Sequence, residues 1–125
     1  MHNVIKVAIA DNHAEYCEAL SCFLADSGFT IVLSAAAGPG LLQLLDPLRP
    51  PDLLIIGCST MYPESIALIR ELKSRFPSTK VLANVVFTHY LPEAWLNETC
   101  IDGWIVKTMV EPAAIIKAIR KACGL

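Results

Sequence analysis

The sequence predicts an α/β fold: a doubly wound five-stranded parallel sheet, with strand order 2-1-3-4-5 and helices on both faces. Short apolar runs alternate along the chain with amphipathic segments of helical period, and the connections between them are short. Right-handed crossovers then place the strands parallel in one sheet. The length of 125 residues and the mass of 13.6 kDa suit a single domain over residues 1–125.

The first half of the chain is expected to hold three strands and two helices. Val4–Ala10 is a short, mostly β-branched run, typical of a strand buried on both faces. Asn12 is expected to cap the next helix, with Glu15 completing a capping box and Ser27-Gly28 ending the helix. The remaining elements of this half are a strand over Phe29–Ala35, a helix from Pro39 to about Leu48, and a very apolar strand over Leu53–Ile56.

The second half repeats the alternation, and each of its expected helices begins at a proline, whose fixed φ suits the first helical position. The expected elements are a helix from Pro63 to about Arg75, a strand over Val81–Phe87, a short helix from Pro92 to about Thr99, a strand over Gly103–Val106, and a helix from Pro112 to about Cys123. The inward residues of the two longer helices are Ile66, Ile69 and Leu72, and Ile115, Ile116, Ile119 and Ala122.

Composition excludes several classes of protein. With 54% hydrophobic and 18% charged residues and a mean hydropathy of +0.51, the chain is not a disordered one. A net charge of −2 and a pI near 5.9 argue against a nucleic-acid surface. No segment is typical of a membrane span or a signal peptide. Five cysteines without C-x-x-C spacing favour reduced thiols, so we expect a soluble, cytoplasmic domain.

Ligands of open α/β sheets bind beyond the carboxyl ends of the strands, at the switch point between strands 1 and 3. The residues expected at this edge are Asp11 and Asn12, Gly57 and Cys58, Val85, and Lys107. The chain has no phosphate-binding loop, metal-ligand spacing or nucleophile elbow. We therefore predict no catalytic residue, no metal and no cofactor.

Four segments resemble response-regulator receiver domains, especially those of LuxR/NarL-type transcription regulators of two-component systems. Ile5–His13 resembles the opening of these domains, Pro51–Ile56 their third strand, Phe76–Leu82 their entry into strand 4, and Asp102–Lys107 their strand 5 with its lysine. The resemblance spans nearly the whole chain. It implies the flavodoxin-like receiver fold and a role in phosphorelay signal transduction and transcription regulation.

Three positions depart from what the resemblance implies. The family has a second acid where this chain has Asn12, and Ser or Thr where it has Val85. The phosphoacceptor aspartate, six residues after the proline that opens strand 3, is matched by Gly57. The first acid, Asp11, and the lysine, Lys107, are retained, as is an aromatic switch position, Trp104.

These departures remove the chemistry of aspartyl phosphorylation. Gly57 offers no nucleophile. Asp11 alone is a poor Mg²⁺ site, because Mg²⁺ takes one or two carboxylates together with phosphate oxygens. Val85 cannot donate a hydrogen bond to a phosphoryl oxygen. The sequence therefore predicts a pseudo-receiver that is not phosphorylated.

Plainer interpretations stand beside these. Asn12 is foremost a helix cap, and Asp11 and Lys107 are expected to form a structural ion pair. Cys58 is expected to be a buried, inert thiol. Trp104 is either a switch aromatic, an interface anchor, or a side chain packed against the last helix.

The favoured function is a phosphorylation-independent interaction module, the regulatory N-terminal part of a DNA-binding transcription regulator. It is expected to form a homodimer through the last helix, completed by the first helix or by the edge of the fourth helix and fifth strand, where Trp95 lies. Expected partners are a C-terminal helix-turn-helix domain or another regulatory protein, with neither nucleic acid nor membrane bound by this domain itself. The alternative is a sensor that binds a small metabolite at the strand carboxyl edge, in space opened by Gly57. An enzyme is the third and least supported reading.

Overall fold

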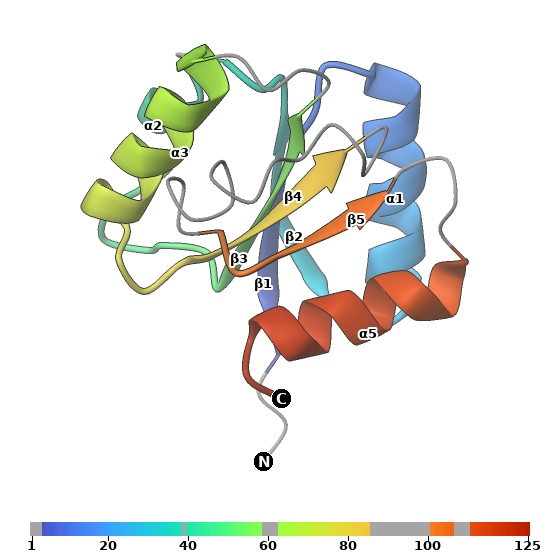
Figure 1. Cartoon of the computed structure of the whole chain (residues 1–125). Coiled ribbons are helices and arrows are strands. Elements are labelled where there is room, and N and C mark those ends of the chain that lie inside the picture. The colour runs from blue at the N-terminus through green and yellow to red at the C-terminus, as the bar shows by residue number, and fades with distance from the viewer. Residues whose placement is uncertain (1–3, 39, 59–62, 86–100, 107–110) are drawn as a thin grey trace.

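The computed structural model describes residues 4–38, 40–58, 63–85, 101–106 and 111–125 (Figure 1). Strands and helices alternate along the described chain as the sequence predicts. In chain order the elements are β1 (Lys6–Ala10), α1 (Ala14–Asp26), β2 (Thr30–Ala35), α2 (Leu41–Leu44), β3 (Leu53–Cys58), α3 (Pro63–Arg75), β4 (Lys80–Val85), β5 (Gly103–Val106) and α5 (Pro112–Ala122).

The five strands form one parallel sheet in the order β2-β1-β3-β4-β5, which confirms the predicted fold class and strand order. β1 lies between β2 and β3, so the switch point falls at the carboxyl ends of β1 and β3. The register of β1 with β2 shifts between Val7 and Ala8, which leaves Val32 as an extra residue in the edge strand β2.

The sheet separates two hydrophobic clusters, and each is covered by different helices (Figure 1). α2 and α3 cover one face, where Ile69 and Leu72 pack against Leu54 and Val81. α1 and α5 cover the other face, where Leu20, Leu24 and Ile119 pack against the alternate residues of the same strands. The predicted inward residues of α3 and α5 therefore lie inward in the structure.

The predicted start of α1 is wrong by one residue. His13, not Asn12, occupies the cap position, and no side chain caps the helix. The Asp11 carboxylate accepts the backbone N–H of His13 at 2.9 Å, which holds residues 11–13 in a turn before the helix begins. Asn12 is exposed, and Glu15 completes no capping box. The C-terminal prediction is confirmed, since α1 ends at Ser27 and Gly28 has a positive φ of 97°.

The second predicted helix, Pro39 to about Leu48, is too long. α2 spans only Leu41–Leu44, and Leu45 already has extended backbone angles. Asp46 precedes Pro47, a position that disfavours helical geometry. Its carboxylate accepts the N–H of Leu48 at 2.9 Å and forms a turn. These local preferences outweigh the apolar periodicity of the segment.

Other boundaries differ by small amounts. β1 begins at Lys6 and β2 at Thr30, because Val4 is exposed and Phe29 lies in the turn after α1. β3 continues through Gly57 and Cys58, which the sequence places after the strand. The predicted extension of strand 4 to Phe87 and the helix from Pro92 to about Thr99, with Trp95, lie outside the described residues.

Asp102, just before β5, forms polar contacts with β4 and α3. Its Oδ2 accepts the N–H of Val81 at 2.8 Å and the ammonium of Lys73 at 3.0 Å. Both Lys73 and Asp102 are about four-fifths buried at the side chain, so these contacts are partly shielded from water.

We expect Asp102→Ala to lower the free energy of unfolding by about 1–3 kcal/mol, because it leaves the Val81 N–H and the Lys73 ammonium without this acceptor. Lys73→Met should cost about 1–2 kcal/mol, because the partly buried Asp102 carboxylate loses the ammonium but keeps the Val81 N–H. Urea unfolding measures both changes. Glu71→Ala is the control, since the exposed Glu71–Arg75 pair is worth under about 0.5 kcal/mol. Equal losses for Asp102→Ala and Glu71→Ala would contradict this role.

Candidate functional site at the carboxyl edge of the sheet

Asp11 lies over Gly57 at the switch point. β1 and β3 are paired up to Ala10 and Ile56, so Asp11 and Gly57 follow side by side on neighbouring strands. A Cβ built on Gly57 would lie 2.3 Å from Asp11 Oδ2 and 2.6 Å from Asp11 Cγ. Real Cβ atoms essentially never come that close to another heavy atom. In this conformation the Asp11 carboxylate occupies the space that a Cβ at position 57 would need, so a side chain there would require the carboxylate to move.

This geometry contradicts the premise of the metabolite-sensor hypothesis. That hypothesis assumes that the absence of a side chain at Gly57 leaves open space for a ligand. The space is filled by Asp11, a residue of the same site. Gly57 is instead the residue that allows Asp11 to adopt this position, because only glycine lacks the atom that would collide with it.

The Asp11 side chain is almost entirely buried, at 2% exposure. Its Oδ1 accepts the His13 backbone N–H at 2.9 Å, and the His13 ring Nδ1 lies 3.3 Å from the same oxygen. The His13 ring itself is 62% exposed. The carboxylate is thus enclosed by the turn that begins α1, with one imidazole at its outer side.

A hydrogen bond that sequence reasoning missed lies beside Asp11. Asn84, in β4, donates from Nδ2 to the Tyr16 hydroxyl of α1 at 2.6 Å. Burial raises the pKa of the Tyr16 phenol; the Asn84 hydrogen bond opposes this rise, and the negative charge of Asp11 adds to it. Asn84 pairs in register with Gly57, so Asp11, Tyr16 and Asn84 gather at one end of the sheet. A single polar residue within the apolar run of strand 4 is the signal that could have found this contact.

The remaining predicted positions are only partly described. Val85 ends β4 and is 2% exposed, packed in the apolar cluster under α2 and α3. It offers no polar atom to this edge. Lys107 lies outside the described residues, so the Asp11–Lys107 ion pair stays a prediction. The side chain of Cys58 is likewise not described.

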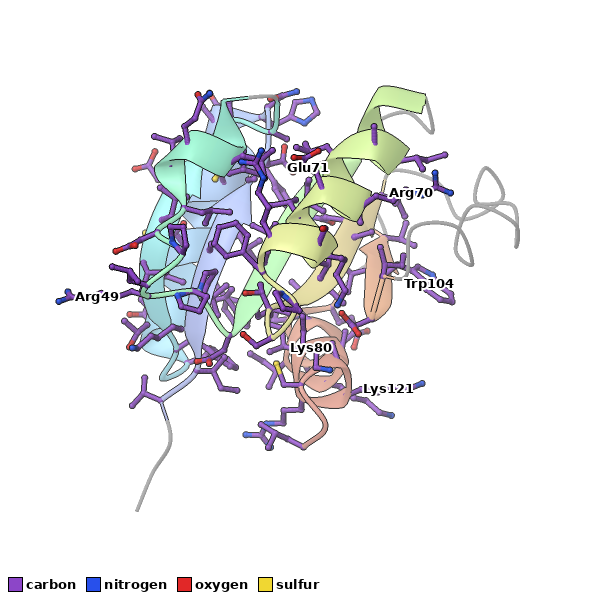
Figure 2. The ribbon with its side chains drawn as sticks, turned by 90° about the vertical axis from the view of Figure 1, so that its left-hand side faces the viewer. Arg49, Arg70, Glu71, Lys80, Trp104 and Lys121 are labelled. Atoms are coloured by element: carbon purple, nitrogen blue, oxygen red, sulfur yellow. The ribbon has the colours of Figure 1, made fainter. Side chains whose placement is uncertain are left out.

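Trp104 does not pack against the last helix, so the interpretation of Trp104 as a side chain packed there is wrong. Its strand neighbour Ile105 faces α5, and alternation along β5 directs Trp104 to the opposite side of the sheet. The side chain is 47% exposed and projects on the same side as Arg70 of α3 (Figure 2). An interface anchor and a switch aromatic both remain compatible with this position.

The surfaces of α1 and α5 carry opposite charges. Glu15, Glu18 and Asp26 are exposed on α1, and Lys117, Arg120 and Lys121 are exposed on α5. Figure 2 shows Lys121 projecting outward from α5. A shallow hollow of about 540 Å³ lies along the outer side of α5, lined by Ala113, Ile116, Lys117, Arg120, Lys121 and Leu125. Both helices cover the same face of the sheet.

Two classes of site are not found in the part of the chain that the structure describes. Within it, no group of three or more His, Cys, Asp or Glu side chains is placed to hold a metal ion. Likewise, none of the described helices combines the length and apolar character needed to cross a bilayer.

Solved structures match this chain over nearly its whole length, whereas no family model and no curated protein matches its sequence. The chemotaxis response regulator CheY4 of Vibrio cholerae is 18% identical, with a TM-score of 0.76, and the match covers 96% of this chain and 99% of that one. A LuxR family DNA-binding response regulator from Silicibacter pomeroyi is 20% identical, with a TM-score of 0.77 and coverages of 97% and 93%. The chain has the response-regulator receiver fold.

A receiver fold is also compatible with other described roles. A pilus assembly-related protein from Burkholderia pseudomallei matches with a TM-score of 0.81 at 18% identity, covering 99% of this chain and 94% of that one. At these identities the similarity concerns the fold. The residues at the carboxyl edge must therefore carry the functional argument.

We expect Gly57→Ala to destabilise the domain by about 1–3 kcal/mol, because the new methyl group collides with the Asp11 carboxylate. In an Asp11→Ala background most of this cost should disappear, which gives a coupling energy of about 1–3 kcal/mol in a double-mutant cycle. Denaturant unfolding of the four proteins measures it.

Gly38→Ala is the matched control, because a Cβ at Gly38 meets no atom within 4 Å. Its effect should stay within about 0.5 kcal/mol. Additive effects of Gly57→Ala and Asp11→Ala would mean that the carboxylate does not lie over Gly57.

Proposed function

We propose that residues 1–125 form one receiver-like domain that acts by protein–protein interaction and is not regulated by phosphorylation. The observation that carries this proposal is the Asp11 carboxylate over Gly57. Gly57 has no phosphoacceptor side chain, and the Asp11 carboxylate fills the space beside it. The domain then has no catalytic role and serves a cytoplasmic regulator as a binding module.

The electrostatics of the edge support the same conclusion. A phosphoryl group adds negative charge, and Mg²⁺ must offset it with the help of one or two carboxylates. Asp11 is engaged by the His13 N–H, the neighbouring Asn12 is neutral, and Val85 is apolar. In this proposal Lys107 neutralises Asp11 directly, in place of holding a phosphoryl oxygen.

Neither Mg²⁺ nor beryllofluoride should stabilise the domain, because a ligand that binds only the native state must raise its melting temperature. Differential scanning fluorimetry with millimolar Mg²⁺, with and without beryllofluoride, measures this. We expect no shift relative to the same buffer with EDTA. A saturable rise that EDTA abolishes would contradict the proposal.

The class of partner is inferred from the charged surfaces of α1 and α5 and not from the carboxyl edge of the sheet. Because no phosphate biases the domain between states, nothing at the edge supplies a differential affinity, and one interaction surface stays presented. We propose a constitutive homodimer through α5, completed by α1. The basic residues of α5 then meet the acidic residues of α1 from the second copy, and the twofold relation repeats the contact.

Sedimentation of the domain at about 100 µM tests the dimer, since a dimer useful in the cell needs micromolar affinity or better. Arg120→Glu should weaken association about tenfold through like-charge repulsion, and adding Glu18→Lys should restore part of it. Arg75→Glu, on α3 at the opposite face, is the control and should change nothing. A monomer of 13.6 kDa at this concentration would refute constitutive dimerisation.

The structure neighbours suggest two kinds of output. The LuxR family neighbour is a DNA-binding response regulator, which supports a linked helix-turn-helix domain as the partner. The pilus assembly-related neighbour has a TM-score of 0.81, which supports a role in pilus assembly as a second candidate. The coding sequence beyond Leu125 distinguishes them, because a helix-turn-helix domain there selects the first.

A further inference from the structure

Asn84 is a buried polar side chain near the carboxyl end of β4. It is 1% exposed, and the other residues of β4 from Val81 to Val85 are buried and apolar. Placing an amide in such surroundings destabilises the fold unless the amide forms hydrogen bonds. The position of Asn84 therefore depends on what its amide contacts.

Its contact is with the first turn of α1, 68 positions away in the sequence. Asn84 Nδ2 donates to the Tyr16 hydroxyl at 2.6 Å, whereas Asn84 Oδ1 is buried without a hydrogen-bond partner among the described residues. Tyr16 is partly buried, and its hydroxyl lies against the buried Asn84 amide. Tyr16 is thus the hydrogen-bond partner that satisfies the Asn84 Nδ2.

Polar contacts join the start of α1 to β4, to β2 and to the residue that follows β1. His13 N–H donates to Asp11, which follows β1, Tyr16 accepts from Asn84 of β4, and Cys17 Sγ lies 2.9 Å from Ser34 Oγ of β2. The later turns of α1 are held by the apolar side chains of Leu20 and Leu24. Hydrogen bonds depend on direction as well as distance, whereas apolar packing tolerates small shifts. The polar contacts therefore fix where the first turn lies on the sheet.

We propose that the Tyr16–Asn84 hydrogen bond is a positioning contact that holds the first turn of α1 in one place and links the closed Asp11 edge to the acidic surface of α1. Tyr16 lies between Glu15 and Glu18 in the sequence, so a shift of Tyr16 displaces both exposed acids. A partner that breaks this bond would release the turn. The link to association rests on the homodimer proposed above.

The test uses Tyr16→Phe, Asn84→Leu and the double variant. Tyr16→Phe leaves the buried amide unsatisfied, so the folding equilibrium constant should fall about tenfold. The double variant replaces both partners by apolar groups and should return to within about threefold of the wild-type constant. Urea unfolding measures this. If Tyr16→Phe does not fold, Asn84→Leu and the double variant still decide the question.

Hydrogen exchange separates positioning from stability. In the double variant, protection of the Cys17 amide, which bonds to the His13 carbonyl, should fall about tenfold, with the Phe29 amide at the other end of α1 unchanged. Ser27→Ala, which removes a contact to Phe23 at that other end, is the control and should leave the first turn protected. Full protection of the Cys17 amide in the stable double variant would overturn the proposal.

Association gives the second readout. The dimer dissociation constant of the double variant should rise about tenfold. An unchanged constant, with the first turn less protected, would refute the link to the dimer while retaining the positioning role. If the wild-type domain is itself monomeric, the homodimer fails, and hydrogen exchange alone decides whether Tyr16 and Asn84 position the turn.

Discussion

The Asp11 side chain, in the conformation that it adopts here, leaves no room for a side chain on the neighbouring strand at position 57. Asp11 follows β1 and Gly57 lies in β3, and the carboxylate of the first occupies the volume that a Cβ of the second would need. The glycine at position 57 is compatible with this conformation of Asp11, because it has no Cβ. The same conformation buries the carboxylate, which then binds the His13 N–H and sets the turn that begins α1. The chemistry of the edge and the placement of the helix therefore depend on one contact.

Further polar interactions lie between the Asp11–Gly57 contact and the exposed surface of α1. Asn84 lies in register with Gly57 and bonds to Tyr16, while Cys17 in the same turn contacts Ser34. The rest of the domain is held by the two apolar clusters on either face of the sheet. In this account, apolar packing provides most of the stability, and the polar contacts specify where the first turn of α1 lies.

Strand and helix alternation was sufficient to predict the sheet, its order and the faces of α3 and α5, because burial dictates those patterns. Two predictions were wrong because local side-chain-to-backbone hydrogen bonds outweighed the sequence pattern. Asp11 accepts the His13 N–H and holds a turn there, so α1 begins one residue later than the expected Asn12 cap, and the turn at Asp46 shortened α2. The sequence also identified Asp11 and Gly57 as site residues, yet it suggested space at Gly57. Only the side-chain conformation of Asp11 reveals that the space is filled, and no periodicity encodes a contact such as Tyr16–Asn84.

The position of the Asp11 side chain is the central claim, and nuclear Overhauser contacts measure it most directly. The β-protons of Asp11 should show strong contacts to the α-protons of Gly57, because the carboxylate lies over that residue. The contacts should persist unchanged when Mg²⁺ and beryllofluoride are added. Absence of these contacts in the free domain, or their loss on adding the two ions, would show an open site and contradict the account.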